Sequence, residues 1–309
     1  MRILVTGGAG FIGSHLVEHF QGRAEVRVLD NLRSGFRHNL TGFAHEFIAA
    51  SILDREAVRQ AMAGVDYVFH LAAMISVPES MTKPVECNEL NTTGTLVVLE
   101  EAARARVRKL VFSSSAAIYG DNPVTPKVET MLPEPKSPYA VTKLDGEFYC
   151  GMFAREGRLQ TACLRYFNVF GPRQDPQSQY AAAVPIFVKR AVRHEPITIF
   201  GDGEQTRDFI YVKDIVAANA YLATQSPATG VFNVAYGQGL SINELARMIC
   251  RQTGSRSEIK YAAERAGDVK HSRAAVEKLR ATGFQPGGTL DAGLRETINF
   301  FQARECSDG

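Results

Sequence analysis

A tyrosine and a lysine four residues apart are the residues in this sequence best suited to acid–base chemistry. Tyr139 and Lys143 follow a run of three serines, and Ser115, the last of these, lies 24 residues before Tyr139. A phenol has a pKa of about 10 in water, so it acts as a base near neutral pH only where positive charge stabilises the phenolate. If a helix begins near Pro138, the two side chains lie on one face of it. The spacing predicts a tyrosine base assisted by Lys143, although the same spacing also occurs in ordinary surface pairs.

A glycine-rich segment near the N-terminus predicts a nucleotide site. Residues 2–6 predict a buried strand and residues 11–20 a helix, and the glycines around their junction are Gly7, Gly10 and Gly13. Glycines in this strand–turn–helix context allow a tight turn and let the backbone approach a pyrophosphate at the helix N-terminus. The segment therefore predicts a dinucleotide-binding loop.

Asp30 indicates which dinucleotide is bound. It follows a second predicted strand, 25–29, and lies 20 residues after Gly10. A carboxylate at this place accepts hydrogen bonds from the ribose hydroxyls and repels a 2′-phosphate. The sequence favours NAD over NADP, while Arg33, close by, argues the other way.

Composition agrees with an enzyme of the cytoplasm. The 309 residues are 45% hydrophobic and 22% charged, with a formal net charge of +2. We expect no nucleic-acid partner because no basic block is present, and no membrane span because no apolar run approaches about 20 residues. The N-terminus lacks the features of a signal peptide. Five widely spaced cysteines without a CxxC pair predict neither disulfides nor a zinc site, and the seven histidines suggest no metal.

The order of the predicted elements indicates an α/β fold with a Rossmann doubly wound parallel sheet. Strands are predicted at 2–6, 25–29, 46–49, 66–71, 109–113 and 160–165, and helices near 11–20, 54–62, 91–106 and 139–156. After residue 168 we predict a helix near 184–194, a strand at 197–200, a helix near 213–225, a capping box at Ser241 to Glu244 before a helix to Thr253, and a last helix from Thr289 through Phe301. We expect an NAD-binding domain at 1–172, rejoined by parts of 208–240, and a smaller C-terminal α/β substrate lobe in 173–309.

The chain resembles the extended short-chain dehydrogenase/reductase family, and within it the nucleotide-sugar 4-epimerases related to UDP-galactose 4-epimerase, including the UDP-N-acetylglucosamine 4-epimerase subgroup. The likeness covers almost the whole sequence. It rests on TGGAGFIG at 6–13, DN at 30–31, HLAA at 70–73, NTTGT at 91–95, FSSSAAIYG at 112–120, SPYAVTK at 137–143, RYFNVFGPR at 165–173, TRDFIYVKD at 206–214 and RAGD at 265–268.

The residues before Tyr119 indicate which reaction of this family to expect. The family's dehydratases carry an acidic pair there to eliminate water, and its decarboxylases carry a glutamate, whereas this chain has Ala116 and Ala117. Without an acid to drive elimination, a 4-keto sugar can only receive its hydride back. Resemblance and chemistry thus both favour C4 epimerisation of a UDP-hexose.

The resemblance also implies roles for the chemical residues. Tyr139 would be the general base on the sugar 4-hydroxyl, Ser115 would hydrogen-bond that hydroxyl, and Lys143 would hold the nicotinamide ribose. Ser115 could instead be a strand-end hydroxyl bonded to backbone. The residues expected to bind NAD are Gly7, Gly10, Phe11, Ile12, Gly13, Asp30, Asn31, Ser34, Ser51, Ile52, Leu71, Ala72, Ala73, Asn91, Tyr139, Lys143 and Tyr166. Ser51 stands where many relatives have an acid that binds the adenine.

A diphosphate would anchor the substrate while the sugar turns over. By resemblance, Arg207 and Arg265 would bind the diphosphate, because guanidinium groups suit phosphate oxygens. The alternatives are that each arginine is a solvated or ion-paired side chain and that Phe200 only packs in the core. The residues expected to bind the UDP-sugar are Ser76, Ser115, Asn168, Ala183, Val184, Thr198, Phe200, Arg207, Arg265, Asp268 and Ser272.

Ser272 bears on the identity of the sugar. Relatives restricted to glucose and galactose carry a bulky tyrosine at the aligned position, and those that accept N-acetylhexosamines carry a small residue. Ser272 and Ser76 therefore favour UDP-GlcNAc/UDP-GalNAc interconversion. Alternatively, Ser272 caps a helix that begins near Arg273. Other readings of the chain are a UDP-glucose/UDP-galactose 4-epimerase, a UDP-uronate 4-epimerase and, more remotely, a non-catalytic NAD-binding sensor. The family further implies a homodimer through the helices at 91–106 and 139–156.

Overall fold

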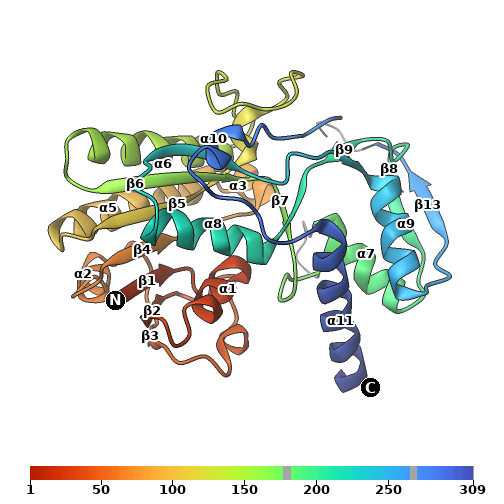
Figure 1. Ribbon diagram of the computed structural model, residues 1–309, viewed down its shortest axis with the longest axis horizontal. Helices are drawn as coiled ribbons and strands as arrows, with labels where there is room; N and C mark the ends of the chain where they lie inside the picture. The colour runs from red at the N-terminus through yellow and green to blue at the C-terminus, as the bar shows by residue number, and fades with distance from the viewer. Residues whose placement is uncertain (177–181, 265–269, 309) are drawn as a thin grey trace.

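The computed structural model describes residues 1–176, 182–264 and 270–308. Its larger domain is built on a parallel seven-stranded sheet (Figure 1). The strand order is β11-β6-β5-β4-β1-β2-β3, and all neighbouring pairs are parallel. The strands are β1 (Arg2–Thr6), β2 (Glu25–Leu29), β3 (Glu46–Ile48), β4 (Tyr67–His70), β5 (Lys109–Ser115), β6 (Gln160–Tyr166) and β11 (Gly230–Val234). This confirms the predicted Rossmann sheet.

Helices cover both faces of this sheet. One face carries α1 (Phe11–His19) and α8 (Val212–Thr224), and the other carries α2 (Arg55–Ala61), α5 (Gly94–Arg104) and α6 (Pro138–Arg155). Successive side chains of β1 point to opposite faces of the sheet, so that Ile3 and Val5 belong to one hydrophobic core and Leu4 to the other. Both faces of the strand are apolar and are therefore covered by helices. A strand buried on both faces reads as a continuous apolar run, as residues 2–6 do.

Short helical segments surround the sheet. They are η1 (Arg37–Leu40), α3 (Val77–Thr82), α4 (Pro84–Asn88), the π-helical turn η2 (Glu89–Thr93) and η3 (Ala116–Tyr119). The helix predicted at 91–106 is therefore divided, since its first residues belong to η2. The helices α3 and α4 were not predicted, because each spans only about two turns or less and has little periodic pattern.

Most of the remaining elements form a smaller α/β lobe. Its helices are α7 (Ala183–Val192), α9 (Ile242–Thr253) and α11 (Leu290–Asp308), and its strand pairs are β7 (Asn168–Phe170) with β10 (Phe209–Tyr211), β8 (Ile197–Phe200) with β13 (Ile259–Ala262), and β9 (Thr206–Arg207) with β12 (Leu240–Ser241). The short helix α10 (Glu277–Arg280) packs instead against β11 of the large sheet. Side chains of α7, α9 and α11 share one core with β8 and β10. The predicted capping box is confirmed, because Ser241 and Glu244 bond to each other's backbone N–H groups.

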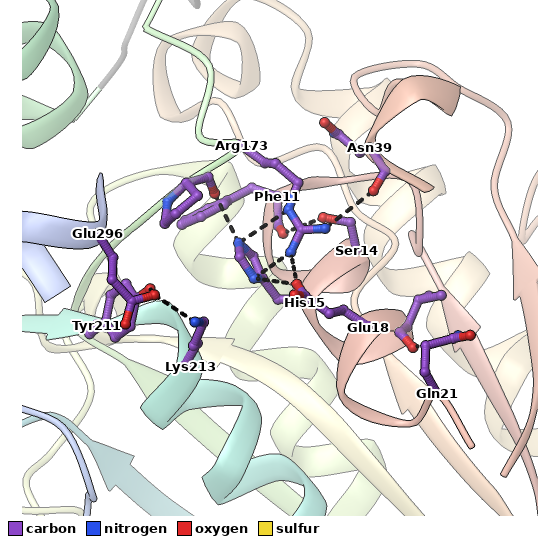
Figure 2. Close-up of polar contacts among 12 residues, drawn as sticks. Phe11, Ser14, His15, Glu18, Gln21, Asn39, Arg173, Tyr211, Lys213 and Glu296 are labelled. Carbon is purple, nitrogen blue, oxygen red and sulfur yellow. Dashed lines mark hydrogen bonds and ion pairs between the residues drawn. The ribbon is translucent and has the colours of Figure 1, made fainter. Parts of the chain in front are cut away.

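A polar cluster joins the lobe to the first helix of the sheet. Figure 2 shows Arg173, which follows β7, beside His15 and Glu18 of α1. The carbonyl of Pro172 lies 2.9 Å from Nε2 of His15, and Arg173 donates to the carbonyl of Asn39 over 3.3 Å. His15 and Arg173 hold the pKa of Glu18 at about 2, so the cluster keeps a carboxylate near neutral pH.

A second polar contact fixes the last helix. Glu296 of α11 accepts hydrogen bonds from the hydroxyl of Tyr211 over 2.8 Å and from Lys213 over 2.5 Å (Figure 2). Because Tyr211 and Lys213 stand where β10 leads into α8, this contact ties α11 to the start of a helix that covers the sheet. No helix in the described part of the chain is long and apolar enough to cross a membrane.

Candidate active site

Three adjoining cavities run from the sheet into the lobe. The glycine-loop cavity has a volume of about 310 Å³, the central cavity about 290 Å³ and the lobe cavity about 320 Å³. The glycine-loop and central cavities share Ser115, Tyr166 and Phe167. The central and lobe cavities share Asn168 and Arg207. The central cavity is further lined by Ala116, Ala117, Tyr119, Gly120, Lys127 and Ser272. Ser115 therefore lies where the glycine-loop cavity meets the central one.

The glycine-loop cavity lies where the strand order reverses. Strands β2 and β3 extend from β1 to one side, and β4, β5, β6 and β11 extend to the other. The loops that follow β1 and β4 consequently diverge at the carboxyl edge of the sheet, where nucleotides bind in open α/β folds. Gly7 after β1 and Leu71 after β4 both line the cavity.

The glycines are required by close contacts in this loop. Gly7 has a φ of +72°, and a Cβ added to it would lie 2.7 Å from the backbone nitrogen of Ala72. A Cβ on Gly13 would lie 2.2 Å from the carbonyl oxygen of Gly7. Only glycine allows α1 to pack this tightly against the turn. The loop thus brings the N-terminus of α1 to the cavity wall.

Asp30 is placed to bind a ribose and also holds the glycine loop. Its carboxylate accepts the N–H of Ala9 over 2.9 Å and that of Leu32 over 2.7 Å. Burial raises the pKa of Asp30. A carboxylate has about four acceptor positions, so two remain for ribose hydroxyls.

The residues of the glycine-loop cavity fit NAD. No side chain caps the N-terminus of α1, whose preceding residue is Gly10, and such a helix end binds phosphate through its free N–H groups. Among the described residues, the buried amide oxygen Oε1 of Gln174 has no hydrogen-bond partner, and Gln174 lines this cavity. A buried acceptor without a donor is expected where a ligand supplies one.

Tyr139 is positioned by the start of α6. The helix begins at Pro138, one residue earlier than expected, and the hydroxyl of its N-cap Ser137 accepts the N–H of Ala140. The backbone N–H of Tyr139 donates to the buried hydroxyl of Ser80 in α3 over 3.2 Å. The Ser115 hydroxyl lies close enough to the Tyr139 phenol to oppose the rise of its pKa, and both side chains line the cavity. The predicted pair of hydroxyl groups is therefore brought together at the cavity wall.

Lys143 does not contact the phenol oxygen in the way expected for a charge partner. Its ammonium donates to the backbone carbonyl of Ser113 over 2.7 Å and lies 5.8 Å from the centre of the Tyr139 ring. Burial raises the pKa of Tyr139, with the nearby Ser115 hydroxyl opposing it, and burial lowers the pKa of Lys143 to about 8. In the protein alone, burial is the largest influence on the pKa of both groups, and the expectation that Lys143 and the charge of the cofactor together lower the pKa of the phenol stays a prediction.

A buried ion pair behind Ser115 was missed by the sequence analysis. Glu147 of α6 accepts hydrogen bonds from Ser114 over 2.5 Å and from Arg165 of β6 over 2.7 and 2.8 Å. Arg165 also lies over the ring of Tyr119, 4.8 Å from its centre. Nothing in the spacing of these residues announces their contact, because β5, α6 and β6 come together only in the fold. The network fixes the strand end that carries Ser115.

Most residues predicted to bind NAD line the glycine-loop cavity. They are Gly7, Gly10, Phe11, Ile12, Gly13, Asp30, Asn31, Ser34, Ile52, Leu71, Ala72, Ala73, Tyr139, Lys143 and Tyr166. Ser51 and Asn91 are not part of the wall. The Ser51 hydroxyl accepts the N–H of Leu53, and the buried amide of Asn91 bonds to both backbone groups of Met74. The structure gives these two residues local structural contacts.

The residues predicted to bind the sugar nucleotide divide in the same way. Those that line the central or lobe cavity are Ser115, Asn168, Ala183, Thr198, Phe200, Arg207 and Ser272. Val184 is fully buried in the lobe core, and Ser76 caps α3 by accepting the N–H of Glu79. Arg265 and Asp268 lie outside the described residues.

Two alternatives to a binding role are wrong for this chain. Ser272 does not cap a helix at residue 273, because the next helix, α10, begins at Glu277, and the Ser272 N–H donates to Thr206. Phe200 is not a core residue, since it is 36% exposed and lines the lobe cavity.

Comparisons with known proteins agree with this site. The family model described as "NAD dependent epimerase/dehydratase family" matches residues 3–235. A UDP-glucose 4-epimerase of Mycolicibacterium smegmatis is 38% identical over 312 residues, covering 98% of this chain and 99% of the relative. A UDP-N-acetyl-alpha-D-glucosaminuronate decarboxylase of Bacillus cytotoxicus is 33% identical and covers 98% of both chains.

Solved structures give the same result. The UDP-N-acetylglucosamine 4-epimerase of Methanobrevibacter ruminantium M1, in complex with UDP-N-acetylmuramic acid, has a TM-score of 0.95 and 41% identity and covers 98% of both chains. The UDP-glucose 4-epimerase of Thermotoga maritima, with UDP-glucose, has a TM-score of 0.93 and 42% identity and covers 99% of this chain and all of the other. These proteins span epimerases with different sugar substrates.

Replacing Lys143 by methionine tests the buried charge. The fall of its pKa from 10.5 to about 8 means that folding is disfavoured by about 3 kcal/mol while the lysine is charged. The penalty is complete below pH 8 and disappears as pH rises to 10.5. Between pH 8 and 10.5 we expect the free energy of unfolding of the wild type, measured in urea, to rise by up to about 3 kcal/mol relative to that of Lys143→Met. The matched variant Lys136→Met, at an exposed site, should show no such trend; a flat difference for Lys143→Met would contradict the prediction.

Proposed function

Since this chain belongs to the NAD dependent epimerase/dehydratase family, we propose that it inverts C4 of a UDP-hexose through a transient 4-keto intermediate. The observation that carries the proposal is the position of Ser115 and Tyr139. Both line the glycine-loop cavity, and Ser115 also lines the central cavity, which continues to Arg207. A sugar in the central cavity would thus present a hydroxyl to both side chains.

The lining of the central cavity supports epimerisation over elimination or decarboxylation. Ala116 and Ala117 form part of its wall, and none of the described lining residues is acidic. Elimination of water from a 4-keto sugar requires a group that donates or removes a proton beside the leaving hydroxyl. This wall offers no carboxylate for that step, so return of the hydride to C4 is the favoured outcome.

The proposed mechanism assigns each step of proton handling to a residue of this chain. NAD, bound in the glycine-loop cavity, supplies the group that takes the hydride from C4 and gives it back. Tyr139 would remove the proton of the 4-hydroxyl and later return it to the same oxygen, while Ser115 would hold that oxygen by a hydrogen bond. Since burial alone raises the pKa of Tyr139, the phenol needs added positive charge to act as a base near neutral pH.

The lobe would hold the nucleotide while the sugar rotates. Arg207 lines both the central and lobe cavities, where a diphosphate would join the sugar to the nucleoside. Asn168 lies at the same junction, and Phe200 would stack beside the uracil. Arg265 and Asp268 belong to the proposal by family resemblance. We accordingly assign NAD binding to residues 1–172 with parts of 208–240, and UDP-sugar binding mostly to 173–309.

UDP-GlcNAc and UDP-GalNAc are the proposed substrates. Ser272 lines the central cavity, where its small side chain leaves room for an acetamido group. The structural neighbour from Methanobrevibacter ruminantium acts on UDP-N-acetylglucosamine, which supports this choice, while the neighbour from Thermotoga maritima supports UDP-glucose as the alternative. A UDP-uronate 4-epimerase is a further alternative. The cytoplasm is the proposed location.

A homodimer is also part of the proposal. On α6, Val141, Phe148 and Met152 are 42%, 60% and 44% exposed, which is unusual for large apolar side chains on one helix. A second copy of this chain would cover them. Sedimentation should give a dimer for the wild type and a monomer for Phe148→Glu; a monomeric wild type would contradict the assignment.

Replacing Tyr139 by phenylalanine tests the proposed base. The variant should fold and bind UDP-GlcNAc as the wild type does, while turnover to UDP-GalNAc falls by about 10² or more, because the phenol oxygen is lost. The assay is NMR detection of the epimer with saturating substrate. Tyr149→Phe, on the same helix but outside the three cavities, is the matched control. A near-normal rate for Tyr139→Phe would place the base elsewhere.

Replacing Ser272 by tyrosine tests the proposed sugar preference. The larger side chain should fill the space for the acetamido group, so turnover of UDP-GlcNAc should fall at least tenfold more than that of UDP-glucose. Both sugars are compared as kcat/KM in the wild type and the variant. An equal loss for both sugars would refute the role of Ser272 in substrate selection.

A further inference from the structure

Arg33 is a cationic residue in the wall of the glycine-loop cavity. It follows β2 and lines the cavity together with Asp30, Asn31 and Ser34. An arginine at this place can bind the 2′-phosphate of NADP, because a guanidinium group matches the geometry of phosphate oxygens. Arg33 therefore opposes the selection of NAD by Asp30 unless another part of the protein holds its guanidinium.

Two glutamates bind the two ends of the Arg33 guanidinium. Nη1 donates to Glu86 of α4 over 2.5 Å, and Nη2 donates to Glu79 of α3 over 2.8 Å. The hydrogen bond to Glu86 is the main reason that the pKa of Arg33 is raised, and it also lowers the pKa of Glu86. Arg33 and Glu86 are therefore both charged near neutral pH.

The two carboxylates come from a different segment of the sheet edge than Arg33 does. Helices α3 and α4 follow β4, whereas Arg33 follows β2, and β1 lies between these two strands. Glu79 and Glu86 are not among the described residues that line the cavity, although Arg33 is. The contacts thus hold the guanidinium against α3 and α4 and cancel the charge that would attract a phosphate.

Lys83 completes this ion-pair network. Its ammonium lies 3.4 Å from the carboxylate of Glu79 and 3.8 Å from that of Glu86, so two cations balance two anions. The Arg33 side chain is 31% exposed and both glutamates are more exposed than that. Ion pairs with this exposure contribute little to stability, so their removal should leave the fold intact.

We propose that Glu79 and Glu86 are specificity-determining residues that exclude NADP by holding and neutralising Arg33. Asp30 repels a 2′-phosphate, but a free guanidinium on the same loop would offset part of that repulsion. The two glutamates remove the offset and leave the Asp30 carboxylate as the dominant charge at the ribose. The inference concerns the choice of cofactor and holds for whichever UDP-sugar the chain converts.

Two variants separate the role of the glutamates from that of charge in general. Glu79→Gln/Glu86→Gln frees Arg33, and the addition of Arg33→Met removes the freed cation. Asp30 is present throughout, so its repulsion is the same in every comparison. Dissociation constants for NAD and NADP are measured on the full chain, freed of bound nucleotide, by competition with NADH, whose fluorescence reports binding.

Glu25→Gln/Glu46→Gln is the matched control. It removes the same charge at the amino-terminal ends of β2 and β3, on the opposite edge of the sheet, where these glutamates pair with Arg2 and Arg27. Thermal unfolding of each variant shows that it is folded.

We expect the wild type and the control variant to bind NAD more tightly than NADP. In Glu79→Gln/Glu86→Gln this preference should fall at least fivefold through tighter binding of NADP, while the affinity for NAD changes less than threefold. Adding Arg33→Met should restore the wild-type preference.

An unchanged preference in the folded Glu79→Gln/Glu86→Gln variant would overturn the inference. So would a gain in NADP affinity that persists after Arg33→Met, because Lys83 would then be the cation responsible. A similar gain in the control variant would also overturn it, since net charge alone would explain the change. These constants do not depend on turnover, so a wild type that epimerises no UDP-sugar would refute the proposed function and leave the role of the glutamates standing.

Discussion

The hydrogen bond from Lys143 to the carbonyl of Ser113 is the contact on which the geometry of the site depends. It ties α6 to the end of β5, so that Tyr139 at the start of the helix meets Ser115 at the end of the strand. The donor is a buried ammonium, and a hydrogen bond to a charged group stabilises more than a neutral one. Desolvation opposes this gain, as the lowered pKa of Lys143 shows. The protein thus places a costly charge beside Ser115 and Tyr139, the proposed reacting groups.

Sequence patterns identified the parts of this site that depend on local contacts. The glycine loop, Asp30 after β2 and the capping box of α9 were all found where they were predicted, because a short sequence pattern marks each of them. The sheet could also be predicted, since a strand buried on both faces leaves a continuous apolar run. The resemblance to a family of known chemistry then allowed residues of distant segments to be assigned to one site.

Other features depend on contacts between distant segments and could not be predicted. Strand β11 joins the sheet beside β6 although more than 60 residues separate them; we expected parts of 208–240 to rejoin this domain, but the segment has no distinctive pattern and no strand was predicted in it. Asn91 and Val184 lie in plausible motifs, yet the fold directs one to the backbone of Met74 and the other to the lobe core. The pKa of Tyr139 likewise reflects burial by several elements, which spacing alone does not reveal.

The central claim is that one hydrogen leaves C4 of the sugar and returns to the same carbon without entering the solvent. UDP-GlcNAc labelled with deuterium at C4 tests it most directly, with the product examined by NMR and mass spectrometry after reaction in ordinary water. Our account predicts UDP-GalNAc that keeps deuterium at C4. Epimer that carries solvent hydrogen at C4 would contradict it, because the hydrogen would then have been removed as a proton instead of a hydride.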